Sequence, residues 1–254
     1  MKRALITGAS GGIGRSLALK LMTEYELIIV ARNENGLKTV QEDIEAAGGK
    51  VEIIMADLTL QKDRQRVYKN VPVGSVDLLI NNAGVGGQSR FAKQDPDKVQ
   101  KIIDLNISAL TEICRHYTPA MKRSQAVINV ASVVGFLPFP FISVYAATKA
   151  YVLSFSEALS EELKKEGVHV MALCPGATRT GFEAAADMQN SSVYSSKIPG
   201  PDEVADYAIN ALRRRKVVAI HGIQNNALVF LATRLLPRKI VRLVTHRIMS
   251  RSST

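Results

Sequence analysis

Short, almost continuous apolar runs alternate along this chain with longer segments of helical periodicity, and this alternation restricts the folds open to it. The apolar runs cover residues 4–7, 27–31, 51–55, 76–81, 126–130, 168–173 and 217–220, and the helical segments include residues 13–23, 34–47, 61–71 and 150–165. Strands without polar alternation belong to parallel sheets, because helices cover both faces of such sheets. The pattern therefore predicts a single α/β domain, a Rossmann-like, doubly wound parallel sheet with helices on both faces.

The first apolar run ends in a glycine-rich stretch, Thr7–Gly14, which opens the first helical segment. Glycines allow the backbone to approach a pyrophosphate closely, and the N-terminus of the following helix presents free N–H groups and a positive dipole end. The stretch therefore predicts a dinucleotide site near the start of the chain. The expected contacts are Gly8, Ser10, Gly12, Ile13 and Gly14.

The second apolar run ends in Ala31 and Arg32, without the acidic residue that usually binds the ribose 2′-hydroxyl of NAD. An arginine suits a 2′-phosphate in charge and in bidentate geometry, which predicts NADP(H) in preference to NAD(H). The alternative is a solvent-exposed arginine without a ligand. Asp57 follows the third run, where it either accepts a hydrogen bond from the adenine amino group or caps the next helix.

Tyr145 and Lys149 stand four residues apart, so a helix would place both side chains on one face. A neighbouring ammonium group favours the phenolate and lowers the pKa of a phenol, which makes it a usable acid near neutral pH. Ser132 lies thirteen residues before Tyr145 and offers a second hydroxyl donor for an alkoxide formed by hydride transfer to a carbonyl. Taken singly, Ser132 could cap a helix, Tyr145 could be a core aromatic residue and Lys149 a surface charge.

Six short motifs follow one another over about the first 180 residues, namely Thr7–Gly14, Asn81–Gly84, Asn106, Ser132, Tyr145–Lys149 and Pro175–Thr180. In order and spacing they resemble the motifs of the short-chain dehydrogenase/reductase family, in its shorter, non-extended branch. Each motif alone is a weak signal, whereas six together are a specific one. Gly11 stands where some NADP(H)-preferring relatives carry a basic residue, so Arg32 is the main indicator of cofactor preference.

The resemblance implies four catalytic residues. Tyr145 would donate a proton to the substrate oxygen, and Ser132 would hydrogen-bond and orient that oxygen. Lys149 would bind the nicotinamide ribose and lower the pKa of Tyr145, and Asn106 would hold a proton-relay water.

The resemblance also implies cofactor contacts beyond the glycine stretch. Asn81, Ala83 and Gly84, which end and follow the fourth run, would touch the adenosine ribose. Gly176 and Thr180 would fix the nicotinamide carboxamide. With Arg32 and Asp57 included, the expected contacts are Arg32, Asp57, Asn81, Ala83, Gly84, Tyr145, Lys149, Pro175, Gly176, Thr178 and Thr180.

These expectations favour an NADP(H)-dependent oxidoreductase that transfers hydride between the nicotinamide and an apolar carbonyl or secondary alcohol. Residues 133–141 hold three phenylalanines and Leu137, and in the family this loop walls the substrate pocket, which favours a lipophilic ketone, an aldehyde or a keto-acyl chain. Part of this run could instead pack beneath a lid or line a subunit contact. Residues 177–201 lack clear periodicity, as is typical of a substrate lid. The alternative function is a catalytically silent nucleotide sensor, or a scaffold of the same fold that binds a membrane or a partner.

The formal net charge of +10 belongs to the end of the chain, since residues 1–206 balance 23 basic against 23 acidic side chains and residues 207–254 hold ten Lys or Arg and no Asp or Glu. We expect a catalytic domain over residues 1–225 and a basic, amphipathic, helical extension over residues 226–254, interrupted at Pro237. Such an extension suits the surface of an anionic membrane, or it packs against the body or a sister subunit. No nucleic-acid recognition motif accompanies the charge, so nucleic acid is not an expected partner.

Cys114 and Cys174 lie in apolar surroundings without metal-ligand spacing, which predicts buried free thiols and no metal site. No apolar leader precedes the first run, and we expect a cytoplasmic protein, either free or peripheral on a membrane surface. Family members are commonly dimers or tetramers, so the resemblance implies a homo-oligomer.

Overall fold

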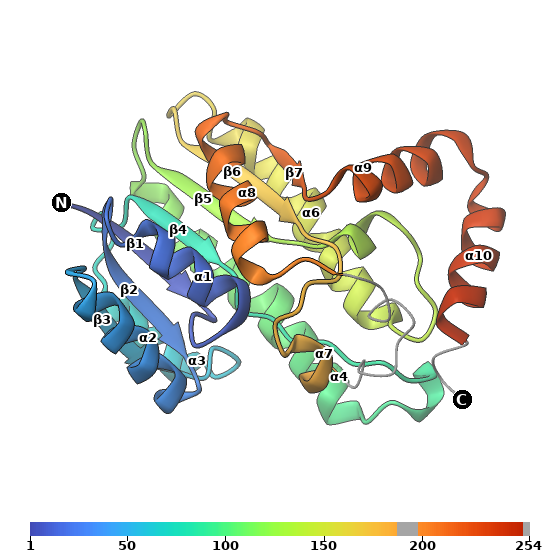
Figure 1. Ribbon diagram of the computed structural model, residues 1–254, viewed down its shortest axis with the longest axis horizontal. Coiled ribbons are helices and arrows are strands. Elements are labelled where there is room, and N and C mark those ends of the chain that lie inside the picture. The colour runs from blue at the N-terminus through green and yellow to red at the C-terminus, as the bar shows by residue number, and fades with distance from the viewer. Residues whose placement is uncertain (187–197, 251–254) are drawn as a thin grey trace.

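The computed structural model describes residues 1–186 and 198–250. Within these residues seven parallel strands form one sheet in the order β3-β2-β1-β4-β5-β6-β7 (Figure 1). The strands are β1 Lys2–Thr7, β2 Tyr25–Ala31, β3 Val51–Met55, β4 Leu78–Asn81, β5 Ala126–Val130, β6 His169–Cys174 and β7 Val218–Ile220. Every predicted run is therefore a strand, although β1 and β2 begin two residues earlier than predicted and β4 two residues later.

Helices cover both faces of the sheet, as predicted, because successive strand residues point to opposite sides. In β1, Ala4 and Ile6 pack under α1, α2 and α8, whereas Leu5 between them faces α3, α5 and α6. The helices are α1 Gly12–Leu21, α2 Glu34–Ala46, α3 Gln61–Asn70, α4 Pro96–Ile103, α5 Leu110–Tyr117, α6 Ser143–Glu162, α7 Phe182–Ala185, α8 Pro201–Arg213, α9 Ile223–Phe230 and α10 Arg238–Ser250.

The centre of the sheet is a topological switch point. Strands β2 and β3 lie on one side of β1, and β4 to β7 lie on the other, so the chain runs outward in opposite directions from β1 and β4. Open α/β sheets bind ligands outside the carboxyl ends of the strands at such a point. The loops that leave these two ends carry Thr7–Gly14 and Asn81–Gly84, so two of the motifs meet there.

Helix α6 begins at Ser143, well before the predicted start at residue 150. Tyr145 and Lys149 therefore lie in its first two turns. Helices α4 and α5 are joined by a π-helical turn, η2 (Asp104–Ala109), which contains Asn106.

The C-terminal part of the chain, drawn in red in Figure 1, consists of α9, a π-helical turn η6 (Leu231–Leu235) and α10. The predicted boundary after residue 225 falls inside α9. Helix α10 follows Pro237 and buries Val241, Thr245 and Met249 against the body. One face of the extension thus packs on its own domain, and no described helix has the length and apolar character needed to cross a membrane.

Candidate active site

The glycine stretch forms a close-packed loop between β1 and α1. Gly8 has a left-handed backbone (φ +67°), and a methyl group on it would lie 2.8 Å from Ala83 Cα. Gly12 also has a positive φ (+53°), and a methyl group there would lie 2.9 Å from Thr180 Cβ. The loop therefore touches the end of β4 on one side and Thr180 on the other. Because α1 starts inside this loop, its first N–H groups are available to a phosphate, which fits a dinucleotide.

Thr7 and Asn82 hold this loop to β4, although neither is among the expected cofactor contacts. Thr7 Oγ1 accepts hydrogen bonds from the N–H groups of Asn82 (3.0 Å) and Ala83 (3.1 Å). Asn82 Nδ2 donates to the carbonyl oxygens of Thr7 and Gly8, both at 3.0 Å. Asn82 stands inside a recognised motif, so the sequence did contain a signal for it. Its function is to fix the glycine loop.

The side chain of Asn81 turns away from the crevice and into the core. Its Nδ2 donates to Asn129 Oδ1 (2.9 Å) and to Cys114 Sγ (3.2 Å), both buried. Ala83 and Gly84 follow on the crevice side. Asn81 therefore supports the end of β4 from below, and a contact with the cofactor would have to come from its backbone.

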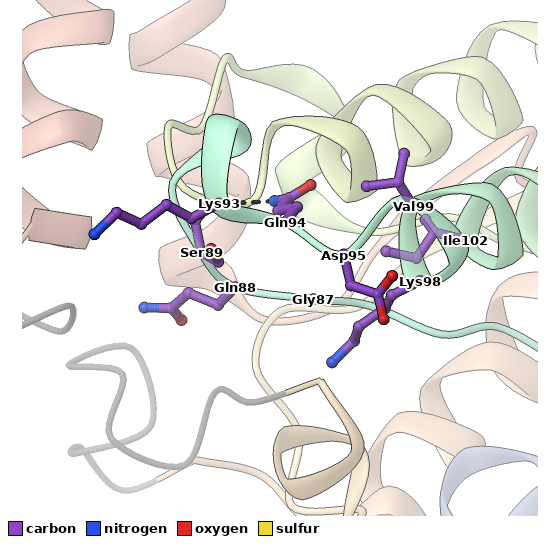
Figure 2. Close-up of a pocket in the computed structure, with 9 residues that line it drawn as sticks. All are labelled: Gly87, Gln88, Ser89, Lys93, Gln94, Asp95, Lys98, Val99 and Ile102. Atoms are coloured by element: carbon purple, nitrogen blue, oxygen red, sulfur yellow. Dashed lines mark hydrogen bonds between the residues drawn. The ribbon is translucent and has the colours of Figure 1, made fainter.

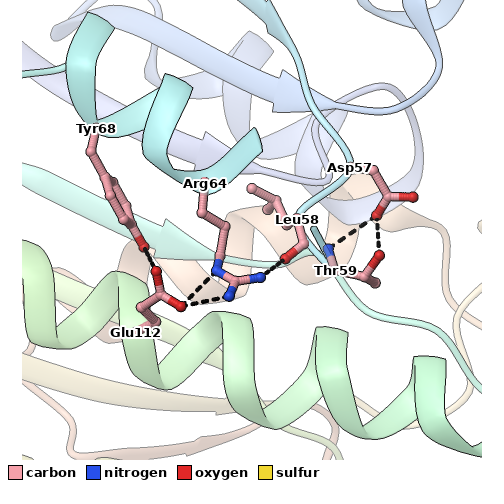
Figure 3. A network of polar contacts seen from close by, with 6 residues as sticks. All are labelled: Asp57, Leu58, Thr59, Arg64, Tyr68 and Glu112. Atoms are coloured by element: carbon pink, nitrogen blue, oxygen red, sulfur yellow. Dashed lines mark hydrogen bonds and ion pairs between the residues drawn. The ribbon is translucent and has the colours of Figure 1, made fainter. Parts of the chain in front are cut away.

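Arg32 lies at the carboxyl end of β2 with its side chain exposed, and its Nη1 is 3.7 Å from Asp57 Oδ2. Asp57 Oδ1 accepts hydrogen bonds from the N–H (3.0 Å) and Oγ1 (2.7 Å) of Thr59, as Figure 3 shows. Burial acts to raise the pKa of Asp57, but the Thr59 hydrogen bonds and the charges of Arg32 and Lys101 outweigh it and hold that pKa below its ordinary value. The Asp57 side chain thus closes a turn ahead of α3 and does not cap that helix.

A second polar network anchors the segment that follows Asp57 (Figure 3). Arg64 Nε donates to Glu112 Oε2 at 2.7 Å, and Arg64 Nη1 donates to the carbonyl oxygen of Leu58 at 2.8 Å. Tyr68 Oη donates to the other oxygen of Glu112 at 3.3 Å. These contacts join α3, α5 and the turn after β3, and so they fix the position of Asp57. Nothing in the sequence singled these residues out.

Ser132 lies just before a 3₁₀ turn, η4 (Val133–Phe136). Its Oγ accepts a hydrogen bond from the N–H of Val134 (3.3 Å) and donates to the carbonyl oxygen of Pro175 (3.3 Å). Ser132 therefore does cap a turn, which is the alternative that its sequence position left open. Its hydroxyl proton can still turn from Pro175 toward a bound oxygen.

Helix α6 presents Tyr145 and Lys149 on one face, and Lys149 Nζ lies 5.8 Å from the centroid of the Tyr145 ring. Lys149 Nζ donates to the carbonyl oxygen of Val130, the last residue of β5, at 2.7 Å. A methyl group on Gly135 would lie 2.7 Å from the carbonyl oxygen of Lys149, so η4 rests directly on α6. The end of β5, η4 and α6 thus bring Ser132, Tyr145 and Lys149 into one site.

Lys149 is buried, and that burial lowers the pKa of its ammonium group to about 8. The neighbouring Cys174 thiol gives no compensating charge near neutral pH, because burial raises its pKa to about 12. Within the described residues the carbonyl of Val130 is the single hydrogen-bond acceptor of Lys149 Nζ. Two of the three ammonium donors are therefore available to a ligand, which suits the hydroxyl groups of a ribose.

Asn106 is held in place by the π-helical turn η2, a feature often found at functional sites. Its Nδ2 donates to the carbonyl oxygen of Val85 (2.9 Å) and to Thr148 Oγ1 (3.0 Å), and its Oδ1 accepts from the N–H of Val85 (3.0 Å). A methyl group on Gly84 would lie 3.3 Å from Asn106 Oδ1 and 3.4 Å from Lys149 Nζ. Because Gly84 has no side chain, a space remains beside its Cα that faces Asn106 Oδ1 and Lys149 Nζ. The second lone pair of Asn106 Oδ1 is available to a water in this space.

The segment after β6 is fixed by short-range hydrogen bonds. Thr178 Oγ1 donates to the carbonyl oxygen of Gly176 at 3.0 Å, and Thr180 Oγ1 accepts from the N–H of Phe182 at 3.2 Å. The carbonyl oxygen of Pro175 accepts a hydrogen bond from the Ser132 hydroxyl. This segment therefore joins Ser132 to the glycine loop, through Pro175 at one end and Thr180 at the other.

Asn225 of α9 also reaches this segment, although no motif in the sequence indicated it. A methyl group on Gly176 would lie 2.5 Å from Asn225 Nδ2, which itself donates to the carbonyl oxygen of His221 at 2.7 Å. The start of the C-terminal extension is thus part of the site.

Helix α7 lies inside the predicted lid. The ring of Phe182 is 5.5 Å from that of Tyr145, centroid to centroid, and a methyl group on Gly86 would lie 2.8 Å from Phe182 Cζ. Residues 187–197 of the predicted lid lie outside the described residues.

Tyr145 belongs to an apolar cluster. Its other members include Phe139, Phe141, Ile142, Phe182, Ala186 and Met249. Leu137, from the same phenylalanine-rich loop, packs instead against Ala232 and Val241 of the extension. The loop therefore walls the site with one part and supports the extension with another.

A cavity of about 220 Å³ lies between the loop after β4 and α4, and Figure 2 shows the residues that line it. Gln94 Nε2 donates to the carbonyl oxygen of Ser89 within its wall, at 3.2 Å. Its lining residues are Gly87, Gln88, Ser89, Lys93, Gln94, Asp95, Lys98, Val99 and Ile102. None of the predicted site residues lines this cavity, so it is separate from the site around Tyr145.

Cys114 and Cys174 are buried free thiols, as predicted. Among residues 1–186 and 198–250, no three His, Cys, Asp or Glu side chains come together in an arrangement suited to a metal ion.

A parallel sheet with a glycine loop at its switch point, and a buried lysine beside a tyrosine and a serine, define a nucleotide-binding oxidoreductase of the Rossmann type. Comparison with known families agrees. The model of the short chain dehydrogenase family matches residues 2–191, and this chain belongs to that family.

Individual relatives agree with this assignment. The chain is 32% identical over 225 residues to the ketoacyl reductase HetN of Nostoc sp., a match that covers 86% of this chain and 78% of that protein. A short-chain dehydrogenase from Sphingobium yanoikuyae, solved in complex with NADPH, is 34% identical with a TM-score of 0.82, covering 90% of this chain and 92% of the other. A family member from Burkholderia phymatum, solved with NAD, is 26% identical with a TM-score of 0.82, covering 91% and 92%.

Proposed function

We propose that this protein is an NADP(H)-dependent oxidoreductase that interconverts an apolar carbonyl compound and its secondary alcohol. The observation that carries the proposal is the buried ammonium group of Lys149, which has one described acceptor and lies 5.8 Å from the Tyr145 ring centroid. A buried charge is costly unless it is paired or functional, and here its remaining donors face the crevice at the switch point. NADPH, when bound, would supply the hydride.

The protein's own contribution is the proton and the orientation of the substrate oxygen. Tyr145 Oη donates the proton, and the adjacent Lys149 ammonium group favours the phenolate that remains. Ser132 Oγ turns its proton from the Pro175 carbonyl to the same substrate oxygen, which stabilises the negative charge that develops there.

Tyr145 then regains a proton from solvent, by a relay that Asn106 and Lys149 hold in place. Both donors of the Asn106 amide are used, so the group that holds a relay water is Oδ1, at the bare edge of Gly84. A water there lies between Asn106 and Lys149 and passes a proton toward the tyrosine.

Arg32 supports a preference for NADP(H). Its guanidinium is exposed at the end of β2, and its ion pair with Asp57 at 3.7 Å is too long to occupy its donors fully. The solved relatives bind NADPH in one case and NAD in the other, so Arg32 is the basis for the preference proposed here.

The aromatic wall around Tyr145 supports a lipophilic substrate, such as a ketone, an aldehyde or a keto-acyl chain. The similarity to a ketoacyl reductase favours the last of these. We also expect a homo-oligomer, a dimer or a tetramer, which light scattering after gel filtration would establish.

The experiment that tests the function is NADPH oxidation against carbonyl compounds graded by chain length and ring size, with Tyr145→Phe alongside. We expect turnover that rises with apolar bulk and falls at least about a hundredfold in the variant, while NADPH binding is retained. Tight NADPH binding without turnover on any compound would favour the nucleotide-sensor alternative. Full activity in Tyr145→Phe would refute the mechanism.

A further inference from the structure

The outward face of α10 is apolar, although its inward face already packs on the body. Ile240, Val244 and Ile248 recur at four-residue steps and are 44%, 49% and 41% exposed, and Leu243 beside them is 63% exposed. At 3.6 residues per turn these four side chains form one stripe along α10, which adjoins the buried face of the helix at Ile248. Such a stripe is not needed for packing on this domain.

The preceding turn and helix extend this apolar surface. Leu228, Phe230, Leu231 and Leu235 are between 44% and 62% exposed. More than half of the large exposed apolar side chains in the described part of the chain belong to α9, η6 and α10. Exposed apolar patches of this kind mark interaction sites.

Cationic side chains accompany the stripe, and no anionic ones do. Lys239 and Arg242 lie along one side of α10, and Arg234, Arg238 and Arg247 are also exposed. None of these lysine and arginine side chains forms an ion pair with a carboxylate in the described residues, and residues 207–254 contain no Asp or Glu. The surface therefore combines exposed apolar side chains with charges that are all positive.

A groove of about 470 Å³ lies between α10 and the phenylalanine-rich loop. His246 of α10 lines it and lies 5.5 Å from Phe141, centroid to centroid, and Phe141 belongs to the apolar cluster around Tyr145. On the opposite side the groove is lined by Arg90 and by Phe91, whose side chain is 67% exposed. The groove thus lies between α10 and the apolar cluster that contains Tyr145.

We propose that the outer face of α9, η6 and α10 docks on an anionic lipid surface. Apolar side chains that enter the acyl boundary, with arginines and lysines at the level of the headgroups, are the features of an interfacial helix. A second copy of this chain is a poorer occupant, because a two-fold contact would bring the same cations together without carboxylates to pair them. If the proposed function holds, docking places the mouth of the groove where an apolar substrate is concentrated.

The test is co-sedimentation of the full-length protein with vesicles of phosphatidylcholine alone or mixed with phosphatidylglycerol, without substrate. We expect binding to the anionic vesicles only, and its loss when salt is raised. Leu243→Ser with Arg242→Glu should weaken binding at least about tenfold. The matched control, Val73→Ser with Lys69→Glu, changes an exposed apolar and an exposed basic residue near the end of α3 and should bind as the wild type does.

Circular dichroism and NADPH binding establish that both double variants are folded. Absence of binding to anionic vesicles, or equal binding by the two double variants, would overturn the proposal. The proposal would also be overturned if the wild type were an oligomer and the Leu243→Ser, Arg242→Glu variant a monomer, since a second copy would then cover the stripe. Because the assay uses no substrate, failure of the proposed oxidoreductase function would leave this result unchanged.

Discussion

Lys149 carries a buried ammonium group, and its burial favours the neutral amine. Burial lowers its pKa to about 8, whereas an unfolded chain would keep the ordinary value near 10.5. Below about pH 8 the native state carries the whole cost of the buried ammonium. Between the two values the native state has released a proton that the unfolded state still binds, so the free energy of unfolding rises with pH over that range.

We therefore predict a pH-dependent difference between the wild type and Lys149→Met without cofactor. From about pH 7 to about pH 9.5 the wild type should gain about 2 kcal/mol of unfolding free energy relative to the variant. Urea unfolding at a series of pH values measures this difference. The comparison removes the contributions of other titrating groups, which both proteins share. Parallel curves would show that the native Lys149 has an ordinary pKa.

Arg32 tests the cofactor preference at the level of one side chain. Replacing it with Asp removes the cation and places an acid where NAD-binding relatives of this fold carry one. The ratio of kcat/KM with NADPH to that with NADH should fall about 10- to 100-fold, since a charge-assisted contact contributes about 1.5–3 kcal/mol. Arg15→Gln is the matched control, because Arg15 pairs with Asp43 at 2.8 Å and should leave the ratio unchanged. An unaltered ratio in Arg32→Asp would remove Arg32 from the site.

At the scale of the elements, the π-helical turn η2 and the loop after β4 act as one unit. Asn106 bonds both the N–H and the carbonyl of Val85, so the loop cannot shift without the turn. Gly84 precedes Val85, and its bare edge is what leaves space between Asn106 and Lys149. The unit therefore sets the size of the gap in which a relay water would lie.

Gly84→Ala should fill that gap. The added methyl group would lie 3.3–3.4 Å from Asn106 Oδ1 and Lys149 Nζ, close enough to displace a water but without a strained backbone, because no positive φ is required there. We expect kcat to fall at least about tenfold, with unfolding temperature little changed. The wild type is the reference in the same assay, and an unchanged unfolding temperature shows that the variant is folded. A kcat equal to that of the wild type would argue against a water at this position.

The strands were predictable from sequence because most of them are apolar on both faces, so that their runs stand out without reference to partners; β3, with Glu52 and an exposed Met55, is the weakest case. The start of α6 was not, since Tyr145, Ala146, Thr148 and Lys149 are all buried and its first turns lack an amphipathic pattern. The proposed catalytic residues were predicted from local spacing and family resemblance. Asn82 lies inside one of the motifs, but its hydrogen bonds to the glycine loop depend on how two distant loops pack. Asn225 lies in none of the motifs, and its approach to Gly176 likewise follows from packing.

For the molecule as a whole, the C-terminal extension connects an exposed surface to the active site. Helix α10 contributes Met249 to the cluster around Tyr145, and Thr245 Oγ1 donates to the carbonyl oxygen of Pro138 at 2.8 Å. The phenylalanine-rich loop is thus held between α6 and α10. The position of the extension should therefore influence how bulky substrates bind, even though its residues lie far from Tyr145 in sequence.

Met249→Ala tests this link. Met249 is 0% exposed, so its truncation should destabilise the protein by about 2–5 kcal/mol through the cavity it leaves. The cavity adjoins the Tyr145 ring surroundings, and we expect KM for the bulkiest accepted ketone to change by more than that for a small one. Leu243→Ala removes a similar volume from the exposed face of the same helix and should alter neither quantity appreciably. Thermal unfolding together with steady-state kinetics on the two ketones measures both effects. Loss of stability with identical KM changes for the two ketones would mean that α10 supports the fold without shaping the substrate pocket.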